Sequence, residues 1–144
     1  MTSSPTESRR PAITPEAQHP FCFVCSGSNP MGLALRYERQ PDGAVTASFI
    51  GHSALEGYPG RLHGGAIASL LDGAMTHCLF AHGIRAVTGE LKVRYLGAVA
   101  AGEPASVQAW LDSAAHGLFQ LRAEIAVAGT VRARATGKFV EPKD

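Results

Sequence analysis

Charged residues are scarce in this sequence. Asp, Glu, Lys and Arg make up only 17% of its 144 residues, whereas an average soluble domain contains about a quarter. The 13 Lys and Arg nearly balance the 12 Asp and Glu, which leaves a net charge of +1 and no run of like charge. The composition therefore gives no electrostatic reason to bind nucleic acid or an anionic membrane. Because the chain is instead rich in Ala, Gly and Val, we expect part of its surface to be covered in a homo-oligomer.

A disulfide framework and a long apolar run are also missing. The three cysteines are an odd number and do not form a complete set of disulfides. Residues 1–20 have no apolar core of the kind found in secretory signals. The most apolar stretch, residues 66–81, is interrupted by polar side chains and falls short of the ~20 residues that span a bilayer. These absences predict a cytoplasmic protein with reduced thiols.

The length suits one domain. Residues 1–20 hold four prolines and show no periodicity, so we expect them to be disordered and residues 21–144 to form the domain. Apolar and polar residues alternate over residues 33–39 and 44–50, which predicts a hairpin. Short turns separate the later alternating segments and favour antiparallel strands. These later segments are residues 86–95, 105–111, 117–128 and 130–140. In the first of them, alternation places two sets of residues on opposite faces: Val87, Leu91, Val93 and Tyr95 on one, and Thr88, Glu90, Lys92 and Arg94 on the other.

One long helix is predicted between the two groups of strands, over residues 63–82. Its larger apolar residues recur at spacings of three and four, and Gly83 follows its end. The other sides are mostly Ala and Gly, so we expect the helix to be buried nearly all round. A single helix of this kind must be wrapped by the sheet. The predicted fold class is α+β, a curled antiparallel β-sheet around one long central helix.

Asp72 stands out within this helix. It is the only Asp, Glu, Lys or Arg between His63 and His82, and no charged residue lies one turn away to pair with it. Burying an unpaired carboxylate costs several kcal/mol, so such a residue has a structural partner or performs chemistry. The structural alternative is a helix face that reaches water or a charge on another strand.

The start of the helix is the second candidate. Gly64 and Gly65 leave its first backbone N–H groups free of side chains, and such groups can hold an anion or polarise a carbonyl. The alternative is that the two glycines allow tight packing or a sharp turn. Gly64 and Asp72 are eight residues apart, hence ~12 Å along the helix axis. Both must come within ~3 Å of one reacting group to act together. Two helices packed antiparallel across a two-fold axis satisfy this, which predicts an obligate dimer if both residues act.

Five segments share the pattern of one protein family: residues 22–25, 29–33, 57–65, 71–72 and 87–95. The most specific part is the His-Gly-Gly run with an Asp nine residues after the His. Over roughly residues 21–140 the chain resembles the hotdog-fold acyl-CoA thioesterases, in particular the phenylacetate-pathway (PaaI-type) branch. The hotdog fold is a curled antiparallel sheet wrapped around a central helix, which agrees with the pattern of elements.

The resemblance implies catalytic roles for three residues. The Gly64 N–H would be the oxyanion donor to the thioester carbonyl. Asp72 would be the nucleophile or the general base that activates water, since the family divides on this point. Thr88 would supply a hydroxyl that orients the water or the carboxylate. The implied reaction is hydrolysis of an acyl-CoA or acyl-carrier-protein thioester, with no cofactor because coenzyme A is part of the substrate, in a dimer or tetramer.

Other positions are expected to contact the substrate or shape its site. His63 would form the helix start, and Gly57 stands where several relatives carry an Asn or Gln that contacts the thioester. Carbonyl polarisation would then fall more heavily on Gly64. Lys92 and Arg94 lie two residues apart on one strand face, where they could meet the phosphates of coenzyme A or simply face solvent. The full set of expected substrate contacts is His63, Gly65, Gly57, Gly89, Lys92 and Arg94.

The pair Cys22-x-x-Cys25 raises the question of a zinc site. Structural zinc takes four ligands. Cys78 lies on the helix that we expect to be buried, and His19 and His52 could complete a set only by coincidence. We therefore predict no metal site. The segment is instead expected to be a loop that packs under the sheet, with Phe21 and Phe23 as its anchors.

Two other functions remain open. A non-hydrolytic acyl-CoA binding or sensing module of the same fold would keep ligand affinity without turnover. A hotdog hydratase or dehydratase typically uses a catalytic His, and none stands beside Asp72 in the middle of the helix. Hydrolysis is the first of the three hypotheses.

Overall fold

The long helix α3 is the centre of the computed structural model, which describes residues 11–143. It runs from Gly64 to Ala81, with His63 as its N-cap and His82 as its C-cap. Gly83 follows with φ of +72°, a left-handed conformation that Gly adopts without strain and that stops the helix. The helix predicted over residues 63–82 is confirmed.

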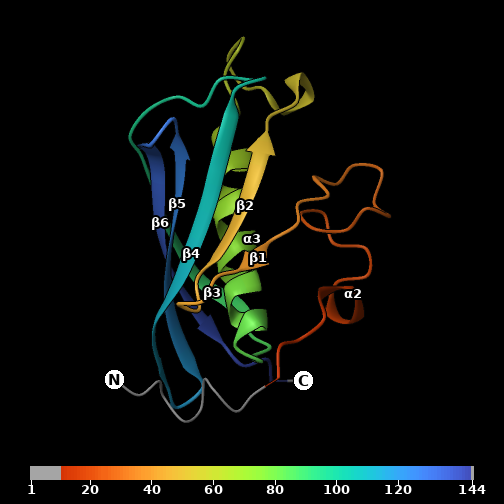
Figure 1. Ribbon diagram of the computed structural model, residues 1–144, viewed down its shortest axis with the longest axis vertical. Helices are drawn as coiled ribbons and strands as arrows, with labels where there is room; N and C mark the ends of the chain where they lie inside the picture. The colour runs from red at the N-terminus through yellow and green to blue at the C-terminus, as the bar shows by residue number, and fades with distance from the viewer. Residues whose placement is uncertain (1–10, 144) are drawn as a thin grey trace.

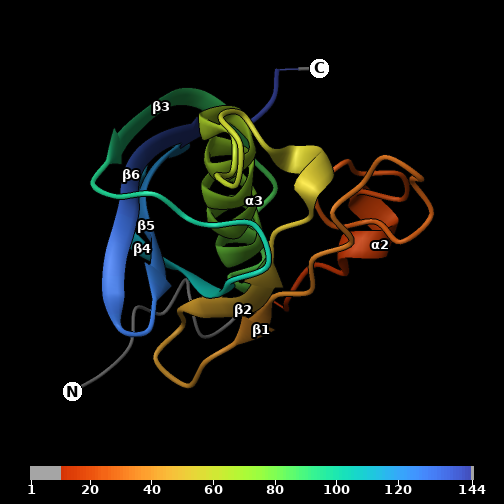
Figure 2. The same ribbon diagram turned by 90° about the horizontal axis from the view of Figure 1, so that it is seen from above.

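The sheet has six strands in the order β1-β2-β4-β5-β6-β3, and each pair of neighbours is antiparallel. It curls around one side of α3 (Figures 1 and 2). Alternate residues of β4, β5 and β6 face the helix and are buried, as the period of two in a strand requires. The predicted curled sheet around one helix is confirmed. The strands are β1 (Glu38–Arg39), β2 (Val45–Ile50), β3 (Val87–Tyr95), β4 (Pro104–Ala115), β5 (Leu118–Val127) and β6 (Thr130–Val140).

The helix is less enclosed than its composition suggests. Residues 77–81 at its carboxyl-terminal end are all buried, but a stripe of small and polar residues along the rest of the helix remains half-buried or exposed in the single chain. This stripe consists of Gly65, Ser69, Asp72 and Thr76, which follow each other at spacings of four and three. Asp72 is therefore accessible to solvent and to a second molecule.

The segment before the sheet lies on another side of α3 (Figure 2). Where we expected a disordered lead-in over residues 1–20, the described part includes one helical turn, α2 (Pro15–Gln18), and the Ile13 N–H donates to the carbonyl of Phe80. Residues 1–10 lie outside the described part. A short 3₁₀ helix, Ser53–Leu55, precedes the loop that leads into α3.

Two details of this segment differ from the sequence prediction. The strand expected over residues 33–39 is reduced to Glu38–Arg39, because the N–H groups of Leu33 and Leu35 donate to the loop carbonyls of Phe23 and Val24 instead of to a strand. Phe21 and Phe23 do not anchor the loop, since they are 61% and 45% exposed. Val24 takes that role and contacts α3.

We predict that Gly73→Ala destabilises the protein. A Cβ at Gly73 would lie 2.6 Å from Cγ1 of Val24. Overpacking of this kind costs about 1–3 kcal/mol, which exceeds the ~1 kcal/mol that Ala gains over Gly in a helix. Denaturant unfolding should show a net loss in the free energy of unfolding. In a Val24→Ala background the loss should be smaller, although the Tyr37 hydroxyl still lies 3.0 Å from the added Cβ. An equal loss there would show that the contact with Cγ1 of Val24 is not the cause.

None of the helices in residues 11–143 has the length and apolar character needed to cross a lipid bilayer.

Candidate functional site

The amino-terminal end of α3 carries one backbone N–H without a partner. The Gly65 N–H donates to Nδ1 of His63 at 2.8 Å, so the His63 side chain caps the helix. The Gly64 carbonyl accepts a hydrogen bond from the Tyr95 hydroxyl at 2.7 Å. The Gly64 N–H makes no hydrogen bond within residues 11–143. Of the two glycines at the helix start, Gly64 is therefore the one whose N–H is available at the positive end of the helix dipole.

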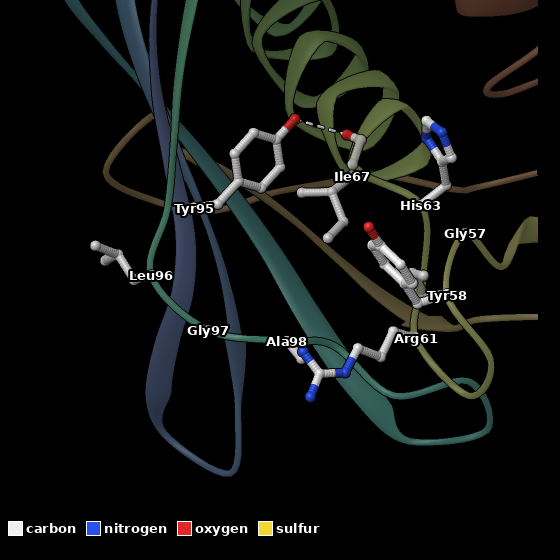
Figure 3. A pocket seen from close by; sticks show the side chains of 11 residues that line it. Gly57, Tyr58, Arg61, His63, Ile67, Tyr95, Leu96, Gly97 and Ala98 are labelled. Atoms are coloured by element: carbon white, nitrogen blue, oxygen red, sulfur yellow. Dashed lines mark hydrogen bonds between the residues drawn. The ribbon is translucent and has the colours of Figure 1, made fainter.

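A pocket of about 690 Å³ opens at this helix end. Figure 3 shows Tyr58 and Arg61 from the loop before α3 on one side, and Tyr95 from the end of β3 on the other. Three residues expected from the sequence at the active site, Gly57, His63 and Gly64, line this pocket. The other lining residues were not expected there: Tyr58, Arg61, Leu62, Ile67, Tyr95, Leu96, Gly97 and Ala98. Arg61 and Tyr95 lie in two of the segments that match the family pattern, residues 57–65 and 87–95. That match was the sequence signal that could have identified them as site residues.

The second candidate lies further along the same helix, at Asp72. Thr88 donates from Oγ1 to Oδ1 of Asp72 at 2.7 Å. Asp72 is half-buried and makes no ion pair within the part of the chain that the structure describes. The carboxyl group is thus positioned by a hydroxyl and has no cationic partner among residues 11–143. One oxygen remains free to act on a water molecule or a carbonyl carbon.

An irregularity in β3 is what turns Thr88 toward the helix. Opposite residues of neighbouring strands point to the same face, and Thr88 pairs with Phe139 whereas Glu90 pairs with Lys138. The register shift between them makes Gly89 an extra residue, a β-bulge. Phe139 is fully buried on the helix side. Strict alternation had placed Thr88 on the same face as Glu90, which is wrong because the bulge reverses the order of the faces.

The same bulge decides where other β3 residues lie. Val87, expected on the inner face, is 48% exposed and pairs with Val140 on the outer side. Lys92 and Arg94 do share a face, but it is the outer, exposed one, and they do not line the pocket of this chain. Gly89 forms the bulge and also lies outside the pocket.

The two candidate centres do not meet within one chain. An unbroken helix joins Gly64 to Asp72, so they remain ~12 Å apart along its axis. The pocket at Gly64 includes neither Asp72 nor Thr88. A single chain therefore holds an available backbone N–H beside a pocket at one place and a hydrogen-bonded carboxylate at another. Acyl transfer to water needs both at one reacting group.

Comparison with known proteins agrees with this fold. The sequence profile of the thioesterase superfamily matches residues 59–133, which is more than half of the chain and includes Gly64, Asp72 and Thr88. The class is thus that of thioester hydrolases with a hotdog fold, as expected from the sequence. The chain belongs to the thioesterase superfamily. No curated protein sequence matches it.

Solved structures share the architecture. A thioesterase superfamily protein is 26% identical to this chain, with a TM-score of 0.80. The match covers 83% of this chain but only 63% of that protein, which is less than two thirds of its length. PaaI from the phenylacetic acid degradation operon of E. coli is 19% identical, with a TM-score of 0.71, over 76% of this chain and 84% of PaaI. A thioesterase protein from Streptococcus pneumoniae, solved with coenzyme A, is 20% identical, with a TM-score of 0.69, over 74% of this chain and 86% of that one.

Proposed function

We propose that this protein hydrolyses the thioester of an acyl-CoA, or of an acyl carrier protein, to a free carboxylic acid and a thiol. The observation that carries the proposal is the pair of groups on one helix. The hydroxyl of Thr88 orients the carboxylate of Asp72, and the Gly64 N–H is available beside a pocket. These are the groups that thioester hydrolysis requires.

The chemistry follows from the two groups. The Gly64 N–H donates to the thioester oxygen and stabilises the negative charge that develops there when the carbonyl carbon is attacked. Asp72 either attacks that carbon itself, forming an anhydride that water then hydrolyses, or removes a proton from the attacking water. In both cases the C–S bond breaks, the acyl group gains a water oxygen, and the thiolate leaves and takes up a proton.

The proposal requires two copies of the chain. Strand β3 is the last strand of the sheet, and its outer edge pairs with no strand among the residues described. An unpaired edge of nine residues can accept another strand. A second copy that pairs its β3 there, antiparallel across a two-fold axis, extends the sheet and brings the Asp72 of one copy toward the Gly64 of the other.

Coenzyme A as part of the substrate is supported by the pocket's chemistry and by the relatives. The Streptococcus pneumoniae protein was solved with coenzyme A. In this chain the exposed Arg61 lies at the pocket, and a guanidinium there could bind a phosphate oxygen. Lys92 and Arg94 contribute in the proposed dimer only if they reach the partner's pocket.

Thiol release from a panel of acyl-CoAs tests the proposal. Short, medium, long and aromatic acyl groups are compared with a thiol reagent, and the signal of the enzyme alone is subtracted. Burial raises the pKa of the Cys78 thiol to about 12, so this thiol reacts slowly. Catalytic turnover of at least one acyl-CoA is expected. Saturable binding without turnover would overturn hydrolysis and favour the non-hydrolytic binding module.

Thr88 gives a graded prediction. Thr88→Val keeps the shape but removes the hydroxyl that donates to Asp72, and we expect kcat to fall by about tenfold because one positioning hydrogen bond of roughly 1.4 kcal/mol is lost. Thr88→Ser retains the hydroxyl and should stay within a few-fold of wild type. Steady-state kinetics on the best substrate measure both variants. Equal rates for the Val and Ser variants would contradict a positioning role.

A further inference from the structure

Three potential metal ligands lie together away from the proposed active site. The ligand atoms of His19, Cys22 and Cys25 all lie within 4.8 Å of one another, and Sγ of Cys25 is 3.8 Å from Nδ1 of His19. A tetrahedral zinc ion with Zn–S bonds near 2.3 Å and Zn–N bonds near 2.0 Å keeps its ligand atoms about 3.5–4 Å apart. The distance between Cys25 and His19 already has this value.

The backbone around the cysteines fixes one of the two sulfurs. The Val24 N–H donates to Sγ of Cys22 at 3.3 Å, which holds this sulfur in position within the loop. Both thiols are free and partly buried, so they are shielded from solvent without being sealed in the core. Because only two residues separate the two cysteines, their sulfur atoms can reach one metal ion.

A further histidine lies on the helix beside His19, outside the group of three ligand atoms that lie within 4.8 Å of one another. His77 is buried, and its Nε2 has no hydrogen-bond partner within the described residues. Its ring centroid is 6.4 Å from that of His19, and its ring stacks on Tyr37 at 4.5 Å. A buried polar atom without a partner is uncommon in a folded protein and calls for an explanation.

We propose that His19, Cys22 and Cys25 bind one zinc ion, with the fourth position taken by water or by His77. The donor set, two thiolates and one imidazole, is the set that zinc prefers over calcium or magnesium. From the sequence we predicted no metal site, because zinc takes four ligands and His19 could complete a set with the cysteines only by coincidence. It is the turn through Pro20 and Phe21 that brings the imidazole to the sulfurs.

The site would have a structural role. The loop that carries the cysteines contacts α3 through Val24, which packs on Gly73, the residue after Asp72. Zinc would cross-link residues 19–25 into one rigid unit, and the Val24 contact would hold that unit against the helix. Metal binding would thereby contribute to the free energy of folding. It would take no part in the hydrolysis, so this proposal is independent of the proposed function.

Metal content tests the proposal directly. The full-length protein is expressed with added zinc, purified under reducing conditions without chelators, and analysed by inductively coupled plasma mass spectrometry. Wild type should hold close to one zinc ion per chain. The Cys22→Ser/Cys25→Ser double variant should hold at least about tenfold less, since even outer-shell changes cost tenfold or more in metal affinity. Cys78→Ser removes a thiol outside the cluster and should match wild type.

Cobalt keeps the test decisive if the double variant does not fold. Titration of metal-free wild type with Co²⁺ should produce the near-ultraviolet charge-transfer band of cobalt bound to thiolates, and His19→Ala should weaken the binding. A chelator should lower the melting temperature of wild type. Zinc at the same level in wild type and the folded double variant, or no thiolate band with cobalt in wild type, would overturn the proposal. So would a disulfide between the two cysteines in the purified protein.

Discussion

The variant Asp72→Asn is expected to release thiol from the best acyl-CoA about a thousandfold more slowly than wild type. The amide has the size of the carboxylate, and its oxygen can still accept the hydrogen bond that Thr88 donates at 2.7 Å. It can neither attack a carbonyl carbon nor take a proton from water. Circular dichroism and the melting temperature should therefore stay near the wild-type values while kcat collapses.

Two controls make this result specific. Asp112→Asn changes an exposed carboxylate that pairs with Arg122 at 3.0 Å and should keep full activity. Because Asn followed by Gly73 can deamidate back to Asp, the Asp72→Ala variant is measured alongside. Near-wild-type turnover in a folded Asp72→Ala would remove Asp72 from the reaction.

The second large effect concerns the backbone N–H of Gly64. Gly64→Pro deletes this group at the first position of α3, where Pro is well tolerated and where the extended His63 already has the conformation that precedes Pro. The loss of one oxyanion donor lowers kcat by about 10²–10³. Gly64→Ala keeps the N–H and adds the same Cβ, 3.3 Å from the Tyr95 hydroxyl. It is the matched control and should lose less than tenfold. Equal losses in the two variants would assign the effect to the added carbon.

The two inactive variants together test where the site is built. If Asp72 of one chain works with Gly64 of another, a mixed dimer of Asp72→Asn and Gly64→Pro has one site with both groups intact. Random pairing makes half of the dimers mixed, so co-expression should restore about a quarter of the wild-type rate per chain. A site within one chain would give no rescue at all, because every chain carries a defect. Purification through two different tags isolates the mixed dimer and should raise the value to about a half.

The helix and the sheet could be predicted from sequence because each rests on local periodicity. Apolar spacing of three and four predicted residues 63–82, and the structure has α3 at Gly64–Ala81. Alternation and short turns predicted the strands after the helix within a few residues. Asp72 and Gly64 could be found because each departs from its surroundings, one as a lone charge and the other as part of a glycine pair at a helix start.

Where the local pattern and the tertiary contacts disagreed, the contacts decided. Strict alternation put Thr88 on the outer face, but the extra residue Gly89 turns it to Asp72. Alternation also predicted a strand over residues 33–39, whose first N–H groups instead pair with a loop. Neither the β-bulge at Gly89 nor the hydrogen bonds to the loop carbonyls produces a periodic pattern of residues, so the sequence could not predict them.

The sequence by itself thus determined the long helix, the strands after it and the family, and it singled out Asp72 and the glycine pair at the helix start, since these depend on residue type and short spacing. Only the tertiary structure decided that Gly64, and not Gly65, keeps an available N–H, because the His63 side chain occupies the other. Only the tertiary structure brought His19 to Cys22 and Cys25 and left the edge of β3 unpaired. Such contacts are made by the path of the chain in three dimensions, which no local pattern of residues encodes.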